Sequence, residues 1–200
     1  GSGTLSVAGT IGVLQPNLPV SLTVTARAAQ LLASDLLNAT ADVDLKLQGE
    51  VAGNLAASGE IRVAKANINI PDSLPQSVAV LNVRRAGEKP VAPAAPGRAL
   101  GLALTIDAPG QVFVRGRGLD AEMGGKLKIG GAAAAPTIDG GFDLRHGTFS
   151  LAGQTLNFTS GKVAFGGTGL AGKLDPTLDF VAQSTTSALT ATLTVTDYAD

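Results

Sequence analysis

The sequence predicts an all-β protein. Large apolar residues alternate with polar or small ones along most of the chain, which is the period of a strand with one buried face. Glycine accounts for 26 of the 200 residues and is spread along the chain, where it disfavours helices. No dependable amphipathic helix accompanies these strands. The pattern therefore predicts many short strands separated by turns.

The first block of strands covers residues 3–83, after Gly1 and Ser2, which we interpret as a vector scar. In chain order its strands are centred on Leu5/Val7, Leu22/Val24, Leu45/Leu47, Ile61/Val63 and Ile68/Ile70. Residues 26–37 are rich in helix formers and predict either a short helix or an irregular strand. Residues 84–98 contain Pro90, Pro93 and Pro96, a composition typical of a flexible surface loop.

The second block, residues 99–200, has the clearest alternation in the chain. Its strands are centred on Leu100–Ile106, Val112/Val114, Leu127/Ile129, Phe142/Leu144, Phe149/Leu151, Leu156/Phe158, Val163/Phe165, Leu178/Phe180 and Leu193/Val195. Glycine and proline between these strands predict turns, as at Pro109-Gly110, Gly124-Gly125, Gly140-Gly141 and Gly161. Because the connections are short, we expect hairpins rather than parallel crossovers.

The two blocks are also related to each other. Leu45–Gly49, with Gly59 and Ile61 after it, resembles Leu127–Gly131, with Gly140 and Phe142 after it, at an offset of about 81 to 82 residues. This repeat predicts an elongated array of β-units. Two packings would bury one apolar face per strand: a β-sandwich of two sheets, or one long sheet that curls around an apolar groove. Patterning alone favours the sandwich.

Composition excludes several classes of function. Fifteen Lys and Arg balance sixteen Asp and Glu, and only seven residues are aromatic, so the footprint of a nucleic-acid-binding protein is missing. Without cysteine the chain has neither disulfides nor thiolate metal sites. No apolar run reaches the ~18 residues of a membrane-spanning helix.

Several local patterns imitate catalytic motifs but lack their context. Gly116–Ala121 matches a dinucleotide-binding spacing, but a strand follows it instead of a helix. Gly167–Lys173 has P-loop spacing, but Leu174 stands where Ser or Thr is required. His146 is the only histidine and has no nucleophile motif around it. Asp42 and Asp44 share a strand face, yet more often such carboxylates simply face solvent. We therefore predict a protein that is not an enzyme, with no catalytic, cofactor or metal site.

An ordered series of segments resembles a known family. It comprises Val112–Glu122, the Leu127 strand, Ala135-Pro136, residues 140–167 (GGFDLRHGTFSLAGQTLNFTSGKVAFGG) and Asp175–Asp179. This series closely resembles the C-terminal domain of the TamB family, which belongs to the AsmA-like bridge-type proteins of the bacterial envelope. The resemblance is strong over residues 99–196 and weaker over residues 4–80.

The resemblance implies a curved, mainly antiparallel β-taco sheet with an apolar concave interior, and it replaces the sandwich as the expected fold. It further implies a periplasmic segment of a single-pass inner-membrane protein that carries phospholipid between the two membranes. The membrane anchor and the segment that contacts the outer-membrane partner, a TamA-like protein of the BamA family, are expected outside these 200 residues. The residues expected to line the lipid groove are Leu102, Leu104, Ile106, Val112, Val114, Leu127, Ile129, Phe142, Leu144, Phe149, Leu151, Leu156, Phe158, Val163, Phe165, Leu178 and Phe180.

Two questions stay open from the sequence. The family is also linked to the insertion of outer-membrane barrel proteins such as autotransporters, and an exposed edge strand that pairs with an incoming strand would serve that role. The charge cluster Arg115, Arg117, Asp120 and Glu122 has two interpretations: recognition of lipid headgroups or a partner at the groove rim, or ordinary ion pairing at a strand end.

Overall fold

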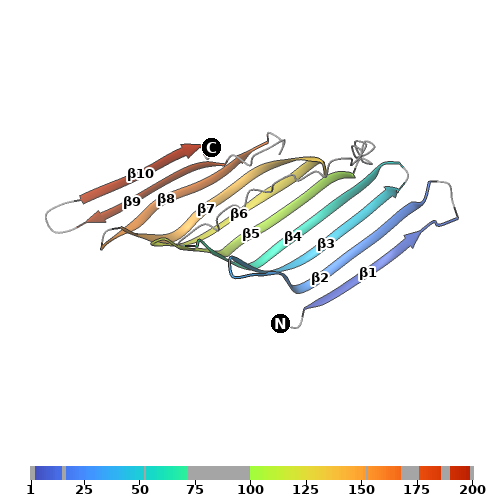
Figure 1. Ribbon diagram of the computed structural model, residues 1–200, viewed down its shortest axis with the longest axis horizontal. Coiled ribbons are helices and arrows are strands. Elements are labelled where there is room, and N and C mark those ends of the chain that lie inside the picture. The colour runs from blue at the N-terminus through green and yellow to red at the C-terminus, as the bar shows by residue number, and fades with distance from the viewer. Residues whose placement is uncertain are drawn as a thin grey trace, which may run out of the picture.

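A computed structural model of the chain contains a single ten-stranded β-sheet in which the strands lie side by side in chain order (Figure 1). The structure describes residues 3–14, 17–51, 53–71, 100–151, 153–167, 176–185 and 190–198. The strands are β1 (Thr4–Ile11), β2 (Pro19–Ala33), β3 (Leu37–Glu50), β4 (Leu55–Asn69), β5 (Leu100–Gly116), β6 (Leu119–Ala132), β7 (Ala135–Leu151), β8 (Gln154–Gly166), β9 (Thr177–Thr185) and β10 (Thr190–Tyr198). No helix occurs among these residues.

The sheet is curved and does not close on itself, because β1 and β10 lie at its two opposite ends (Figure 1). Within the described ranges there is no second sheet, so the open curved sheet is confirmed and the sandwich favoured by patterning alone is wrong. The segments interpreted as a vector scar (1–2) and as a flexible loop (84–98) lie outside the described residues.

Every neighbouring pair of strands is antiparallel except β4 and β5, which pair in parallel. The expectation of hairpins alone is therefore wrong at this one junction. Residues 70–99 connect the two strands, and β4 has 15 residues. At about 3.3 Å per residue, the end of β4 at Asn69 and the start of β5 at Leu100 lie about 50 Å apart, a distance that a short turn does not span.

The strands are longer than the sequence predicts, because many glycines expected in turns lie inside strands. Gly124-Gly125 lies within β6, Gly140-Gly141 within β7, and Pro109-Gly110 within β5. At Gly125 an added Cβ would collide with the carbonyl oxygen of Gly141 on the next strand. These glycines permit close approach between strands rather than a reversal of the chain.

Residues 26–37, left open between helix and strand, belong mostly to β2, which runs to Ala33. A bend over Ser34–Leu36 then leads into β3. The backbone N–H and the hydroxyl of Ser34 both donate to the carbonyl oxygen of Leu37, and the N–H of Leu37 donates to the hydroxyl oxygen of Ser34. The helix formers in this segment are overridden by pairing with β3, which supplies their backbone groups with ladder partners.

A row of β-bulges crosses the sheet near the middle of its strands. The bulged segments are Arg27-Ala28 in β2, Ala64 in β4, Pro109–Gln111 in β5, Arg145 in β7 and Thr159 in β8. The register sets the bulges at nearly the same level on successive strands. Asp42 lies opposite the first bulge, and Gly124 lies opposite the third. Since a bulge bends its strand, a row of bulges bends the whole sheet along one line.

The most buried side chains follow this same line. Ala41 is 0% exposed, Ala108 and Ala182 are each 1%, and Ala121 is 2%. A methyl group on one layer of sheet is covered this fully only where larger side chains from both arms of the sheet lean over it, which happens on the inner side of a bend. Ala108, for example, packs in one cluster with Val112 and Met123, and Phe142 and Val163 pack against that cluster. The bend is therefore concave on the face that carries these residues.

The internal repeat corresponds to two three-stranded groups, β2–β4 and β5–β7. The strands β3 (Leu37–Glu50) and β6 (Leu119–Ala132) begin 82 residues apart, as the sequence offset of 81 to 82 predicts. The parallel junction between β4 and β5 is the boundary between the two groups. The sheet thus grows along one axis by the addition of similar units.

Candidate functional site

Register places all seventeen residues expected to line the groove on one face of the sheet. Residues directly opposite each other on paired strands point to the same side. Leu104 lies opposite Ile129, Phe142 opposite Val163, and Phe149 opposite Leu156. The same pairings, followed strand by strand, bring together Leu102, Leu104, Ile106, Val112, Val114, Leu127, Ile129, Phe142, Leu144, Phe149, Leu151, Leu156, Phe158, Val163, Phe165, Leu178 and Phe180. We call this surface the apolar face.

The apolar face continues into the first block, where the sequence reasoning named no groove residue. Parallel pairing sets Ile61 opposite Ile106 and Ile68 opposite Val114. From there the register adds Val43, Leu45, Leu47, Leu22, Val24, Leu5, Val7 and Ile11. The same period-2 alternation marks these residues in the sequence. The apolar face therefore reaches from β1 to β10, where it ends on Leu193 and Val195.

Nothing in the described part of the chain covers the apolar face. Exposure is greatest toward the margins of this face, where Leu5 is 71% exposed, Leu151 54% and Val195 43%, whereas Val112 and Leu156 are only 7% and 8% exposed. The accessible surface of the chain is 13656 Å², about 1.6 times the roughly 8,700 Å² expected for a compact monomer of 19.9 kDa. Large apolar side chains that are exposed together on one face of a sheet indicate a binding surface.

Two aromatic side chains pack against each other on the C-terminal part of the apolar face. The rings of Phe158 on β8 and Phe180 on β9 meet edge to face, with centroids 5.7 Å apart. Phe180 lies over Gly161, where an added Cβ would come within 2.5 Å of the ring. The glycine thus leaves the space that the ring occupies.

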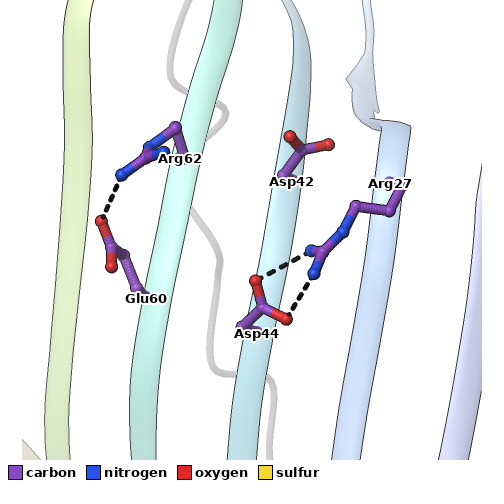
Figure 2. A pocket seen from close by; sticks show the side chains of 5 residues that line it. All are labelled: Arg27, Asp42, Asp44, Glu60 and Arg62. Carbon is purple, nitrogen blue, oxygen red and sulfur yellow. Dashed lines mark hydrogen bonds and ion pairs between the residues drawn. The ribbon is translucent and has the colours of Figure 1, made fainter.

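The opposite, polar face carries the charged residues. A depression of about 310 Å³ on this face is lined by Arg27, Asp42, Asp44, Glu60 and Arg62. Figure 2 shows these five side chains. The guanidinium of Arg27 donates to both carboxylate oxygens of Asp44, at 2.8 and 2.9 Å. Hydrogen bonding from Arg27 lowers the pKa of Asp44, and the same bond raises the pKa of Arg27. Arg62 pairs with Glu60 at 3.4 Å.

The protein's own donors occupy the two aspartates that were weighed as a cation pair. Asp42 accepts the backbone N–H of Ala28 at 2.8 Å, and Asp44 is held by Arg27. Both carboxylates lie on the polar face, as their spacing on one strand predicts. Across the described ranges, no group of three or more His, Asp or Glu is placed to hold a metal ion.

The charge cluster at the β5–β6 end of the sheet also lies on the polar face. Arg115 pairs with Asp120 at 3.1 Å and its guanidinium stacks 4.9 Å from the ring centroid of Phe113. Glu122 accepts from His146 at 2.8 Å and from the backbone N–H of Gln111 at 2.9 Å. Arg117 lies in the turn that joins the two strands. These contacts agree with ion pairing near a strand end, on the side of the sheet away from the apolar residues.

The motif imitations do not acquire the structures that their chemistry requires. Gly116–Ala121 runs from the end of β5 through a turn into β6, so no helix follows the glycines. The P-loop spacing at 167–173 falls almost wholly outside the described residues. Ser150 lies within β7, and its backbone N–H bonds Gly118.

The chain matches the family described as TamB C-terminal domain over residues 1–200. No curated protein sequence matches it. The part of the chain that the structure describes has no helix that would cross a membrane.

Proposed function

Because the chain belongs to the TamB family, a family of non-enzymatic bacterial envelope proteins, we propose that its apolar face carries phospholipid acyl chains between the inner and outer membranes. The observation that carries this proposal is the apolar face, which continues across all ten strands on the inner side of the bend and has no second layer over it within the described residues. A protein whose apolar surface served only its own core would cover that surface with a second layer.

An acyl chain gains free energy from such a surface without any specific hydrogen bond. Each methylene removed from water contributes about 0.8 kcal/mol. Leu, Ile, Val and Phe on successive strands offer this gain at every step along the sheet, so a chain moves along the track without leaving an apolar environment. Because similar apolar side chains repeat along the surface, it suits movement of the acyl chain rather than tight binding at one point.

The positions of the charged residues support one orientation of the lipid, with the acyl chains on the apolar face and the headgroup in water. Charged side chains of the central strands, such as Lys126, Lys128 and Asp143, lie on the polar face, outside the bend. Headgroups would therefore point away from the apolar face, through the open side of the curve and into water. In this proposal the chain works in the periplasm as part of a membrane-anchored protein that passes lipid to a TamA-like outer-membrane partner.

A charge placed on the apolar face tests the proposal. Leu104→Asp and Phe158→Asp put a carboxylate in the path of the acyl chains, at a cost of several kcal/mol if the charge stays unrelieved. Thr105→Asp and Asn157→Asp are matched controls on the same strands, one residue away and on the opposite face. Phospholipid extracted from each purified variant is quantified by mass spectrometry.

We expect bound phospholipid in the wild type and both controls, and its loss from both apolar-face variants. Equal phospholipid in all four folded variants would contradict the proposal. Circular dichroism shows whether each variant keeps its strand content.

The second candidate function is strand pairing with nascent outer-membrane proteins. It is favoured by the two ends of the sheet, since in the described residues β1 pairs only with β2 and β10 only with β9. Neighbouring residues of an edge strand turn their N–H groups to opposite sides, so proline at Thr192 or at Leu193 removes one donor from the open edge of β10. Loss of barrel insertion in one of these variants, with phospholipid still bound, would favour this function over lipid transport.

A further inference from the structure

Two side chains of the polar face, Asp42 and Arg27, bond the backbone at the bulge in β2. Arg27 and Ala28 together oppose the single residue Asp42. Ala28 has a left-handed backbone, with φ of 47°, and its N–H donates to Asp42 at 2.8 Å. Arg27 donates to the carbonyl oxygen of Ala26 at 3.1 Å. One carboxylate thus holds the N–H side of the bulge, and one guanidinium holds a carbonyl.

The bulge in β5 has a matching carboxylate contact, while its arginine comes from another strand. Here Pro109–Gln111 oppose the single residue Gly124. Gln111 is left-handed, with φ of 59°, and its N–H donates to Glu122 at 2.9 Å. Arg145 donates from β7 to the carbonyl oxygen of Pro109 at 3.0 Å.

Glycine at position 124 makes this second contact possible. Arg145 on β7 reaches the carbonyl of Pro109 on β5 across the intervening strand β6. A Cβ on Gly124 would lie 2.6 Å from that oxygen and 3.0 Å from Arg145 Nε. Any larger residue would therefore push the arginine away from the bulge.

The two sets of contacts occupy corresponding places in the repeat. Strands β2 and β5 each open a three-stranded group, and each has a left-handed residue that is not glycine at its bulge. That conformation is unfavourable for alanine and glutamine, so it persists only where the surroundings hold it. In both groups a carboxylate from the next strand supplies the hold.

We propose that Asp42 and Glu122 are positioning residues that fix the bend of the sheet. The bend in turn sets the width of the trough, by which we mean the space between the two arms of the sheet on the apolar face. Arg27 and Arg145 complete the two clamps from the carbonyl side. This inference rests on the proposed function for its effect on lipid, but the bend itself is a property of the chain alone. Without the carboxylates the bulges lose their geometry, and the two arms of the sheet sample a wider range of angles.

Distance measurements between spin labels test the clamps directly, and the absence of native cysteine allows labels at chosen sites. Cysteines at Asp139 and Ser150 place labels on the two sides of the β7 bulge. Cysteines at Asn38 and Lys46 on β3 flank Asp42, which lies opposite the β2 bulge. Glu122→Ala is measured with the first pair and Asp42→Ala with the second. Glu60→Ala is the matched control, since Glu60 is a carboxylate of the same face that pairs with Arg62 but bonds no bulge.

We expect distance distributions at least twice as broad in Glu122→Ala and Asp42→Ala, and unchanged in Glu60→Ala. Asp42→Asn keeps an acceptor oxygen and retains the wild-type width. Adding Ala28→Gly to Asp42→Ala, or Gln111→Gly to Glu122→Ala, narrows the distribution again, because glycine adopts the left-handed conformation without help. Wild-type widths in both alanine variants, or no rescue by glycine, would overturn the clamps.

Phospholipid bound to the same variants tests the link to the trough. A threefold or greater loss in the alanine variants, restored with glycine, supports the link, and unchanged lipid in variants with broadened distances overturns it. If the wild type itself binds no phospholipid, the proposed function fails, while the label distances still decide whether the carboxylates hold the bend.

Discussion

Gly161 offers the sharpest test of how the apolar face is packed. An alanine Cβ at this position would lie 2.5 Å from two ring atoms of Phe180 and 2.9 Å from the Cβ of Leu144. The Phe180 ring has to move, and its edge-to-face contact with Phe158 at 5.7 Å breaks. Overpacking of this kind costs about 1 to 3 kcal/mol, and the lost aromatic contact adds about 0.5 to 1.5 kcal/mol.

Gly166 on the same strand is the matched control. An added Cβ there meets nothing within 4 Å, and its backbone is not left-handed. Gly166→Ala therefore leaves stability unchanged or raises it slightly, because alanine reduces the entropy of the unfolded chain. Urea unfolding of both variants gives the difference in the free energy of unfolding. The two costs together are about 1.5 to 4.5 kcal/mol, so at about 2 to 4 °C per kcal/mol Gly161→Ala lowers Tm by about 3 to 18 °C. Equal stability of the two variants would refute the packing described.

Two further predictions concern the charged depression and the line of the bend. Because bonding to Arg27 lowers the pKa of Asp44 below its ordinary value of 3.8, the pair stabilises the fold at pH values above that value. The stabilisation is lost as pH falls through the lowered pKa, so the stability advantage of wild type over Asp44→Asn disappears under acid, which unfolding curves at several pH values measure. Ala41→Leu overpacks a fully buried position and costs about 1 to 3 kcal/mol, whereas Ala56→Leu, on an exposed position, changes stability by less than about 0.5 kcal/mol.

A wild-type advantage over Asp44→Asn that persists at the lowest pH would mean that charge pairing with Arg27 does not stabilise the fold. Ala41→Leu as stable as Ala56→Leu would mean that the inner side of the bend is not closely packed.

The sequence predicts the apolar face well, because the alternation of side chains depends only on the strand itself. Leu104 and Ile106 point to one side of β5 whatever strand lies beside it. The same reasoning applies to Leu45 and Ile61 in the first block, which show the same alternation. Parallel pairing of β4 with β5 joins those residues to the same surface.

The bulges could not be predicted from the sequence, because local composition does not distinguish a bulge from a turn. Pro109-Gly110 and Gly124-Gly125 have the composition of turns, and only the neighbouring strands decide whether such residues reverse the chain or bend it. Glu122 and Arg145 are ordinary surface charges in the sequence. Their role depends on β5, β6 and β7 being adjacent in register, which local patterns do not determine.

The central claim is that phospholipid acyl chains lie on the apolar face. The most direct measurement is photocrosslinking in cells, with a photoreactive amino acid at Leu104 in one variant and at Thr105 in another, within the full-length protein. These positions are adjacent in sequence and on opposite faces of β5. The proposal predicts crosslinked phospholipid at Leu104 and none at Thr105. No lipid adduct at Leu104, or equal adducts at both positions, would contradict it.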